Sequence, residues 1–325
     1  VQLPPSNGYT SRVDNFGEVE NKGIEFNLDG IIMNKDDLNW TVNANIGINR
    51  NKLKKLNSNL DFQLGPSVGF SQAYPILFMV DQPLGIYWGA ETDGVYSSWE
   101  EANASGIAGA APGEIRYINH HVDLDDSGQP LEIQEINFDD YVKIGDPNPD
   151  FTYSISNNFS YKNWDANILF TGQKGGDLFW VDSWQLSGLQ KTTNILSSSY
   201  VNSWIAPLTY QNGNYIYDES IGNLDSANHP GAMIETGSRA ISSDRNIFDG
   251  SFIRLKNINI GYNFDFSQGR NMRVYISGQN LFVWTDYPGY DPEVRTYTKN
   301  PQKRGVDFGT YPCLLYTSPS PRDRG

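Results

Sequence analysis

Polar and apolar residues alternate with a period of two over several long stretches of the chain. In segment 40–49, WTVNANIGIN, the even positions are apolar and the odd positions are polar or glycine. The same pattern recurs in segments 24–29, 151–161, 164–171, 258–264 and 272–279. Because successive side chains of a β-strand point to opposite faces, each stretch predicts a strand with one apolar and one polar face. A soluble β-sandwich shows the same alternation, so single strands do not decide the fold.

The connections between the predicted strands are of two kinds. Short turns near 34–37, 162–163 and 267–270 each join two strands, whereas segments 51–150, 172–250 and 285 onward are very long. This asymmetry is typical of outer-membrane barrels, whose short turns are periplasmic and whose long loops are extracellular. Structureless loops of this length are uncommon in soluble domains, so we expect some to contain hairpins, with 84–95 as one arm. The pattern predicts an all-β fold, an antiparallel transmembrane β-barrel.

Aromatic residues near the predicted strand ends fit the girdles at the two membrane surfaces. They are Trp40, Phe151, Tyr161, Trp164, Phe264, Phe282 and Trp284. Strands are rich in aromatic residues in any case, so each ring alone is weak evidence. Only about six barrel strands can be recognised, fewer than the smallest such barrels contain. We therefore expect the barrel to be partial, with its other strands outside this chain.

Composition narrows the class further. Mean hydropathy is −0.51, and no run approaches the ~18 apolar residues that a spanning helix requires, which excludes a helical membrane protein. Residues 1–5, VQLPP, have neither the basic nor the apolar region of a signal peptide, so either the chain is cytosolic or its true beginning is missing. The net charge of −14 argues against a nucleic-acid partner, since binding phosphates requires clustered Lys and Arg.

A series of short motifs runs through the chain in a fixed order. They are GEVENKGIE at 17–25, NRNKL at 49–53, QPLGIYWG at 82–89, TDGVY at 92–96, PGEIRY at 112–117, IGDPNPDF at 144–151, FIRLKN at 252–257, GQNLF at 278–282 and YPGYDPEV at 287–294. In content and order they resemble the motifs of the SusC-like (RagA-like) TonB-dependent transporters. The resemblance runs from about residue 15 to residue 312.

The resemblance implies that residues 1–312 are the C-terminal part of a TonB-dependent receptor barrel of roughly 22 strands. The N-terminal plug, the TonB-contact segment and the first strands would lie outside this chain. The whole protein would sit in the lipid of the cell outer membrane. It would import a glycan or peptide held between the barrel and a SusD-like surface lipoprotein, driven by the TonB complex. The fragment is not expected to transport by itself.

The last residues depart from the family pattern. After residue 312 the family continues into a final strand that ends in an aromatic residue, whereas segment 313–325 has no period-two pattern and contains two prolines. Residues 313–323, CLLYTSPSPRD, also match codon for codon the translation of a transposase adapter used in sequencing libraries. We therefore expect 313–325 to be a non-native tail. The alternative is a proline-rich disordered tail.

One acidic loop is a candidate calcium site. Asp123, Asp125 and Ser127 occupy the alternating positions of a D-x-D-x-S-G run, whose oxygen atoms suit Ca²⁺. The family resemblance supports the site, because relatives often carry DLNGDGKID here. The twelfth position of the loop is Gln134 rather than a bidentate glutamate, however. The alternative is a solvated acidic loop, and no other cofactor is expected.

The second long segment, 172–250, is rich in aromatic residues, which suit the faces of sugars when Asn and Asp lie beside them. The candidate ligand contacts are Trp180, Trp184, Tyr200 and Trp204. The alternative is that these rings pack the loop itself or contact the lid lipoprotein.

Nothing in the sequence indicates catalysis, and we expect the protein not to be an enzyme. The three histidines lack metal-ligand spacing, and the sequence has no G-x-S-x-G, phosphate-loop or dinucleotide motif. Two interpretations compete with the transporter: a secreted soluble β-sandwich that binds carbohydrate through its tryptophans, and an extracellular glycoside hydrolase. The transported substrate cannot be predicted from the sequence.

Overall fold

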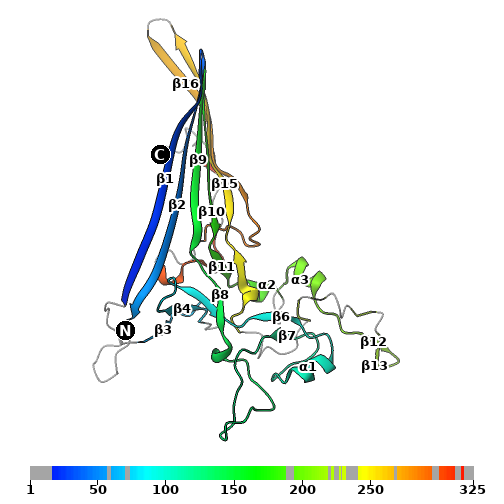
Figure 1. Ribbon diagram of the computed structural model, residues 1–325. Helices are drawn as coiled ribbons and strands as arrows, with labels where there is room; N and C mark the ends of the chain where they lie inside the picture. The colour runs from blue at the N-terminus through cyan, green and yellow to red at the C-terminus, as the bar shows by residue number, and fades with distance from the viewer. Residues whose placement is uncertain are drawn as a thin grey trace, which may run out of the picture.

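A computed structural model describes residues 17–56, 60–69, 74–187, 194–218, 221–222, 227, 229–231, 241–266, 269–294, 300–311 and 316–317. Its main feature is one antiparallel sheet of long strands (Figure 1). The strands, in spatial order, are β1 (Gly17–Lys35), β2 (Leu38–Leu56), β9 (Pro149–Tyr161), β10 (Trp164–Gly175), β15 (Phe252–Phe266), β16 (Arg270–Trp284) and the two-residue β18 (Tyr316–Thr317). The six long strands are the six that the alternation predicts.

The short turns lie together at one end of this sheet, at the top of Figure 1. The β1–β2 turn contains Asp36 at φ +40° and the β9–β10 turn contains Lys162 at φ +52°, a left-handed conformation that closes a two-residue connection. Backbone hydrogen bonds join neighbouring turns: the Lys162 N–H donates to the Asp37 carbonyl at 3.0 Å. All three predicted turns are confirmed in position, although residues 267–268 of the third lie outside the described residues.

Strand register places the apolar residues on one face and the polar residues on the other. One apolar row crosses five strands at Trp40, Phe159, Ala166, Ile260 and Ile276. The adjacent polar row runs through Thr41, Asn158, Asn167, Asn259 and Ser277. Large apolar side chains stay exposed on the apolar face, as in Ile24 at 71% and Ile276 at 69%. Such a face belongs against hydrocarbon, and the polar face belongs in a lumen.

The apolar face has the height of a membrane. On β9, Tyr161 and Phe151 mark its two aromatic ends. Ten residues at about 3.4 Å each give about 34 Å along the strand, which a tilt near 40° reduces to roughly 26 Å. The apolar band of outer-membrane barrels is about 25 Å tall.

An asparagine ladder crosses the polar face from β15 to β1. The Asn257 amide donates to Asn167 at 3.1 Å, Asn167 to Asn158 at 2.7 Å and Asn158 to Asn43 at 2.9 Å. The Asn43 amide then donates to the Asp29 carboxylate. A carboxylate only accepts, so it fixes the orientation of each amide in the row.

Adjacent substitutions on β2 test the assignment of the two faces. Val42→Lys places a charge within the apolar band and should destabilise the folded full-length protein by roughly 2 kcal/mol. Thr41→Lys places the same charge on the polar face and should change stability by less than about 0.5 kcal/mol. Urea unfolding in detergent or lipid vesicles, followed by tryptophan fluorescence, measures both. An equal loss of stability in the two variants would contradict the assignment of the lipid and lumen faces.

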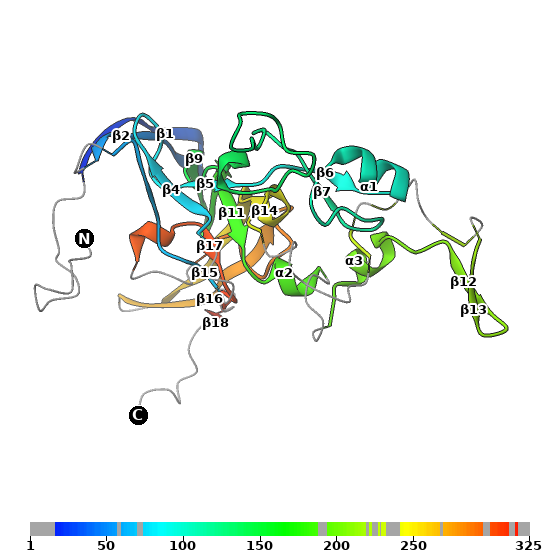
Figure 2. The ribbon, with the colours of Figure 1, turned by 90° about the horizontal axis from the view of Figure 1, so that it is seen from below.

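The three long segments fold into a loop body at the other end of the sheet, below the strands in Figure 1 and seen from below in Figure 2. The first segment contains β3 (Phe62–Leu64), β4 (Ile76–Met79), β5 (Ile86–Gly89), β6 (Thr92–Val95), α1 (Trp99–Ser105), β7 (Ile115–Tyr117), η3 (Phe138–Asp140) and β8 (Val142–Gly145). The second contains β11 (Asp177–Trp180), α2 (Ser183–Leu186), α3 (Ser197–Asn202), β12 (Leu208–Gln211), β13 (Asn214–Tyr217), η5 (Asp244–Asn246) and β14 (Ile247–Asp249). The third contains η6 (Pro301–Lys303) and β17 (Val306–Asp307).

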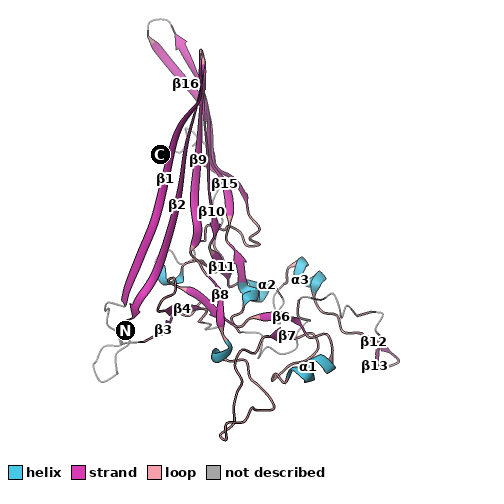
Figure 3. Ribbon diagram, in the orientation of Figure 1, coloured by secondary structure: helices cyan, strands magenta, loops and turns pink. Residues whose placement is uncertain are grey.

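The loop body has small sheets of its own and holds the helices of the described chain (Figure 3). β3, β4, β5 and β8 form one sheet, β6 pairs with β7, and β12 pairs with β13. β11 lies between β14, which is antiparallel to it, and β17, which is parallel. The expected arm at 84–95 is present as β5 and β6, which join different sheets.

One hydrophobic core unites the three segments. Leu53 from the end of β2, Phe179 from β11 and Val306 from β17 are each fully buried in it, together with Ile76, Tyr87 and Trp184 among others. Phe179 lies 5.7 Å from the Tyr87 ring and 5.6 Å from the Trp184 ring, centroid to centroid. Because burial of large apolar side chains is the main source of stability, the loops form one folded unit rather than three separate excursions.

The soluble-sandwich interpretation does not fit this architecture. In a sandwich, the apolar faces of two sheets pack on each other. Here many large apolar side chains on the outer face of the main sheet are exposed, and the main hydrophobic core of the described residues lies in the loop body instead. Within the described residues, no helix is long and apolar enough to cross a membrane.

Candidate functional site

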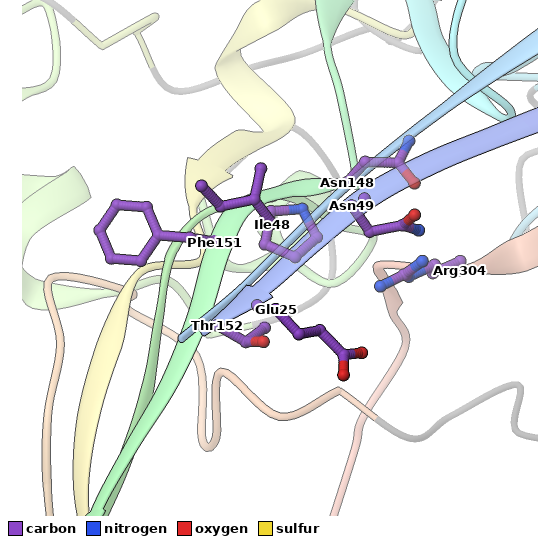
Figure 4. A pocket seen from close by; sticks show the side chains of 10 residues that line it. Glu25, Ile48, Asn49, Asn148, Phe151, Thr152 and Arg304 are labelled. Carbon is purple, nitrogen blue, oxygen red and sulfur yellow. The ribbon is translucent and has the colours of Figure 1, made fainter. Parts of the chain in front are cut away.

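A polar pocket of about 540 Å³ opens where the lumen face of β1, β2 and β9 meets the loop body (Figure 4). It is lined by Gly23, Glu25, Gly47, Ile48, Asn49, Asn148, Pro149, Phe151, Thr152 and Arg304. These residues come from β1, β2, the start of β9 and the third long segment. The pocket is therefore built jointly by the barrel wall and the loops.

Strand register explains the space and the polarity of this pocket. Glu25 on β1 lies opposite Gly47 on β2, and Gly47 lies opposite Thr152 on β9. All three belong to the lumen face. Because Gly47 has no side chain, a hollow remains between the Glu25 carboxylate and the Thr152 hydroxyl.

Buried contacts hold Arg304 at the rim. The Tyr87 hydroxyl donates to the Arg304 carbonyl at 3.0 Å, and the Phe179 N–H donates to the next carbonyl, that of Gly305, at 3.0 Å. Burial of the Tyr87 ring raises the pKa of its hydroxyl well above the usual value. The phenol therefore stays neutral and remains a donor. Gly305 has φ +72°, which turns the chain beneath Arg304.

Asn148, which lies on the same side of the pocket as Arg304 in Figure 4, is fixed by hydrogen bonds to two other parts of the chain. Its side-chain oxygen accepts from the Asn51 amide at 2.8 Å, and its own amide donates to the Leu84 carbonyl at 3.2 Å. Asn51 also accepts from the Leu84 N–H at 2.6 Å. These bonds connect the end of β2, the first loop and the start of β9, so this wall of the pocket is preorganised.

The polar groups of this pocket suit non-covalent binding of a ligand rather than catalysis. A carboxylate, a guanidinium, amides and a hydroxyl line one concave surface, and they can pair with a ligand that presents both donors and acceptors. Within the described residues, no group of three or more His, Cys, Asp and Glu side chains could hold a metal ion.

Comparison with known proteins gives the family. The chain is 33% identical to TonB-dependent receptor P3 of Formosa agariphila over 95% of its own length, and it spans 29% of that protein. It is 24% identical to TonB-dependent receptor SusC of Bacteroides thetaiotaomicron over 97% of its length, spanning 27% of SusC. No family model matches.

The fold agrees with solved structures. The RagAB peptide importer in its closed-closed state superimposes with a TM-score of 0.69 at 19% identity, over 98% of this chain and 31% of that chain. The RagAB peptide transporter gives a TM-score of 0.67 at 18% identity, over 98% and 30%.

The chain is part of a SusC/RagA-like TonB-dependent receptor. It spans about 30% of the length of the receptors it matches. The predicted family, barrel class and outer-membrane location are confirmed. TonB-dependent receptors are transporters and not enzymes, which confirms the expectation of no catalytic role.

The four aromatic residues predicted to contact ligand are not brought together in this receptor. Trp180 is buried against Phe248 and Tyr287, and Trp184 is buried against Phe179. Burial supports the alternative that these two rings pack the loops.

The other two aromatic candidates differ from them in exposure. Tyr200 is 72% exposed on α3. Trp204 packs so closely on Gly113 that a Cβ there would lie 2.5 Å from its ring. As ligand contacts, all four residues stay predictions, and Tyr200 is the most accessible of them.

The predicted calcium loop is held by its own hydrogen bonds. Asp125 Oδ1 accepts from the Ser127 N–H at 2.8 Å, the Ser127 hydroxyl at 2.6 Å and the Gln129 N–H at 2.9 Å. These bonds, with the hydroxyl of Ser127 contributing most, hold the pKa of Asp125 below its usual value. Asp123 accepts instead from the Glu135 N–H at 2.9 Å. Calcium binding stays a prediction, and calorimetric titration at millimolar Ca²⁺ tests it.

Sequence reasoning did not select the pocket residues. Glu25, Asn49 and Asn148 all lie within family motifs. Glu25 also stands at one of the polar positions of the β1 alternation, so the pattern alone predicts that its side chain faces the lumen. Arg304 had no such signal. It belongs to a segment whose approach to the strands depends on Val306 entering the loop core.

Proposed function

We propose that this chain forms part of the barrel wall and the extracellular loops of an outer-membrane importer. The importer takes up glycans or oligopeptides together with a SusD-like lipoprotein. The observation that carries the proposal is the combination of a lipid-exposed apolar face, a polar lumen face and a folded loop body at one end only. An N-terminal part of the whole receptor would contact the TonB complex. The loop body would face the cell exterior, where the lipoprotein closes over the ligand.

Two features support a partner on the loop body. The name RagAB, given to the importer whose fold this chain shares, denotes a complex. The loop body also exposes apolar side chains that the hydrophobic core does not use, including Trp99 at 63% and Ile133 at 62%. Exposed apolar side chains of this size would be covered if the lipoprotein docks on this part of the loop body.

The charged groups of the pocket favour an oligopeptide over a glycan as its ligand. Glu25 and Arg304 offer one negative and one positive group on the same hollow, which matches the ammonium and carboxylate groups of a peptide. Glycan hydroxyl groups could pair with Asn49, Asn148 and Thr152 without using either charge. An oligopeptide ligand would therefore depend on the two charged residues, and a glycan would not.

Uptake by the full-length receptor tests the proposal. Cells that express the full-length receptor together with a SusD-like lipoprotein should accumulate a fluorescent oligopeptide or oligosaccharide, and deletion of the receptor gene should abolish the uptake. Recovery of the full-length protein in the soluble fraction without detergent would contradict the proposal. So would hydrolysis of a glycan by the purified protein that a single Asp or Glu substitution removes.

The charged pocket residues discriminate the two ligand classes. Glu25→Gln and Arg304→Gln should each lower the affinity for an oligopeptide about tenfold, because each removes a charge-assisted hydrogen bond. Affinity for an oligosaccharide should change less than about twofold. Glu18→Gln and Arg270→Gln remove equivalent charges outside the pocket and serve as controls. Calorimetry with the purified receptor–lipoprotein complex measures all four. Loss of oligosaccharide affinity in the pocket variants would contradict the peptide assignment.

A further inference from the structure

Three basic side chains lie on the outer face of the sheet at the loop end of its apolar band. Lys22 on β1 lies opposite Arg50 on β2, and Arg50 reaches β9, where its guanidinium lies 3.2 Å from Asp150. On the far side of β9, Phe151 lies opposite Lys174 of β10. Extending the β2–β9 register beyond the Gly47–Thr152 pair puts Arg50 level with Pro149, so Lys174 lies one outward-facing position nearer the membrane than Lys22 and Arg50. The next outward-facing residues toward the membrane are apolar, beginning with Ile24 and Ile48.

An apolar groove of about 620 Å³ lies beside Lys174 on the same face. Its walls include Phe151, Tyr153, Ile253 and Trp284, while Lys174 and Asp286 lie among its polar residues. Register aligns Tyr153, Gly172, Ile253 and Trp284 across four strands. A Cβ at Gly172 would lie 2.5 Å from the Tyr153 hydroxyl oxygen, so the absence of a side chain at this position lets the Tyr153 ring lie flat along the groove.

The three cations are accessible, and Arg50 is also oriented by hydrogen bonds to the backbone carbonyls of Pro149 and Asp150 at 3.1 and 2.9 Å. The side chains of Lys22, Arg50 and Lys174 are 74%, 57% and 58% exposed. Each has one carboxylate partner: Glu20 at 2.9 Å from Lys22, Asp150 beside Arg50, and Asp249 at 3.3 Å from Lys174. Exposed pairs of this kind contribute little, so a phosphate, with up to two charges and three acceptor oxygens, can replace a carboxylate.

We propose that this outer rim is a docking site for a phosphorylated glycolipid of the outer leaflet. The headgroup phosphates contact Lys22, Arg50 and Lys174, and an acyl chain enters the groove between Tyr153 and Trp284. The exposure of the three cations, each paired with an exposed or half-exposed carboxylate, supports the headgroup contact. The continuity of the groove with the lipid-exposed apolar face supports the acyl-chain contact. The site is independent of the ligand that the receptor transports.

Binding of a defined glycolipid to the full-length receptor tests the site. Diphosphoryl lipid A is titrated against the detergent-purified protein and followed by native mass spectrometry. The variant Lys22→Gln/Arg50→Gln/Lys174→Gln should bind at least tenfold more weakly than the unmodified protein. The matched control Lys35→Gln/Lys162→Gln/Arg270→Gln removes three cations from the turn end and should bind normally. Heat-modifiable migration on gels shows that each variant is folded.

Two further measurements separate the contribution of the phosphates to the affinity from that of the acyl chain. Dephosphorylated lipid A should bind the unmodified protein at least tenfold more weakly, and millimolar inorganic phosphate should not displace the glycolipid, because phosphate lacks the acyl chain. Should the triple variant fail to fold, the single variants Arg50→Gln and Lys174→Gln should each weaken binding severalfold. Unchanged binding in the rim variants, an equal loss in the turn-end control, or equal binding of the dephosphorylated lipid would overturn the proposal.

Discussion

Replacing Arg254 with leucine is expected to destabilise the docking of the third long segment by about 3–5 kcal/mol, because it removes the guanidinium that pairs with a buried carboxylate. Arg254 is 2% exposed and Asp291 is 3% exposed, and the guanidinium donates to the Asp291 carboxylate. Arg254 Nε also lies 2.8 Å from Glu293 Oε2, at an angle that makes the contact electrostatic rather than a hydrogen bond. Lys256 lies 3.5 Å from the same oxygen, so Glu293 keeps a cationic neighbour when Arg254 is replaced, whereas Asp291 loses the guanidinium of Arg254.

Limited proteolysis of the folded full-length receptor measures this effect locally. The variant should be cleaved by trypsin after Lys303 and Arg304 at least a hundredfold faster than the unmodified protein, while the membrane-embedded strands remain protected. The double variant Arg254→Leu/Asp291→Leu removes both charges and should recover part of the protection. Equal cleavage of the unmodified protein and the single variant would show that the ion cluster does not hold the segment.

Phe179→Ala should lower the stability of the loop body by about 3–5 kcal/mol, since it removes a fully buried ring from a closely packed core. The ring lies between Tyr87 and Trp184 and therefore joins the first and second long segments. Its own backbone N–H donates to the Gly305 carbonyl, so the third segment is affected as well. Binding of the lipoprotein should weaken with it if the loop body forms the contact surface.

Tyr200→Ala is the matched control from the same long segment. Tyr200 is an aromatic residue that is 72% exposed, so its removal should change loop stability by less than about 0.5 kcal/mol. Hydrogen exchange of the loop-body amides in the full-length receptor distinguishes the two variants. Unchanged protection in Phe179→Ala would mean that the loops are held by something other than this core. A loss of ligand affinity in Tyr200→Ala, with protection intact, would support the predicted contact of Tyr200.

The strands and their faces were predictable from the sequence because a period of two is a local property. The alternation around Trp40 and around Ile260 marks the apolar face without any knowledge of their partners. A β-bulge in β15 limits this rule, however. The register of β15 with both neighbours shifts at Lys256, so Arg254 faces inward although its parity matches outward-facing Ile258. Counting even and odd positions along the sequence alone would have placed the side chain of Arg254 in the lipid.

The loop body and the pocket were not predictable for a different physical reason. Leu53, Phe179 and Val306 meet in one core although more than a hundred residues separate each from the next along the chain. Their strands are only two to four residues long apart from β2, too short for a periodic signal. Arg304 reaches the pocket only because Val306 is anchored in that core. Residue type suggested sugar contacts for Trp180 and Trp184, but their burial depends on the same long-range packing.

The asparagine ladder gives the lumen wall a direction. Four side-chain amides from Asn257 to Asn43 all point their N–H groups toward β1, because the carboxylate of Asp29 at the end of the row can only accept. Their dipoles therefore add along the circumference instead of cancelling. A solute that slides past this wall would meet hydrogen-bond donors and acceptors in an order that depends on its orientation. This part of the barrel surface can thus distinguish the two ends of a neutral polar chain, with a charge only at the end of the row.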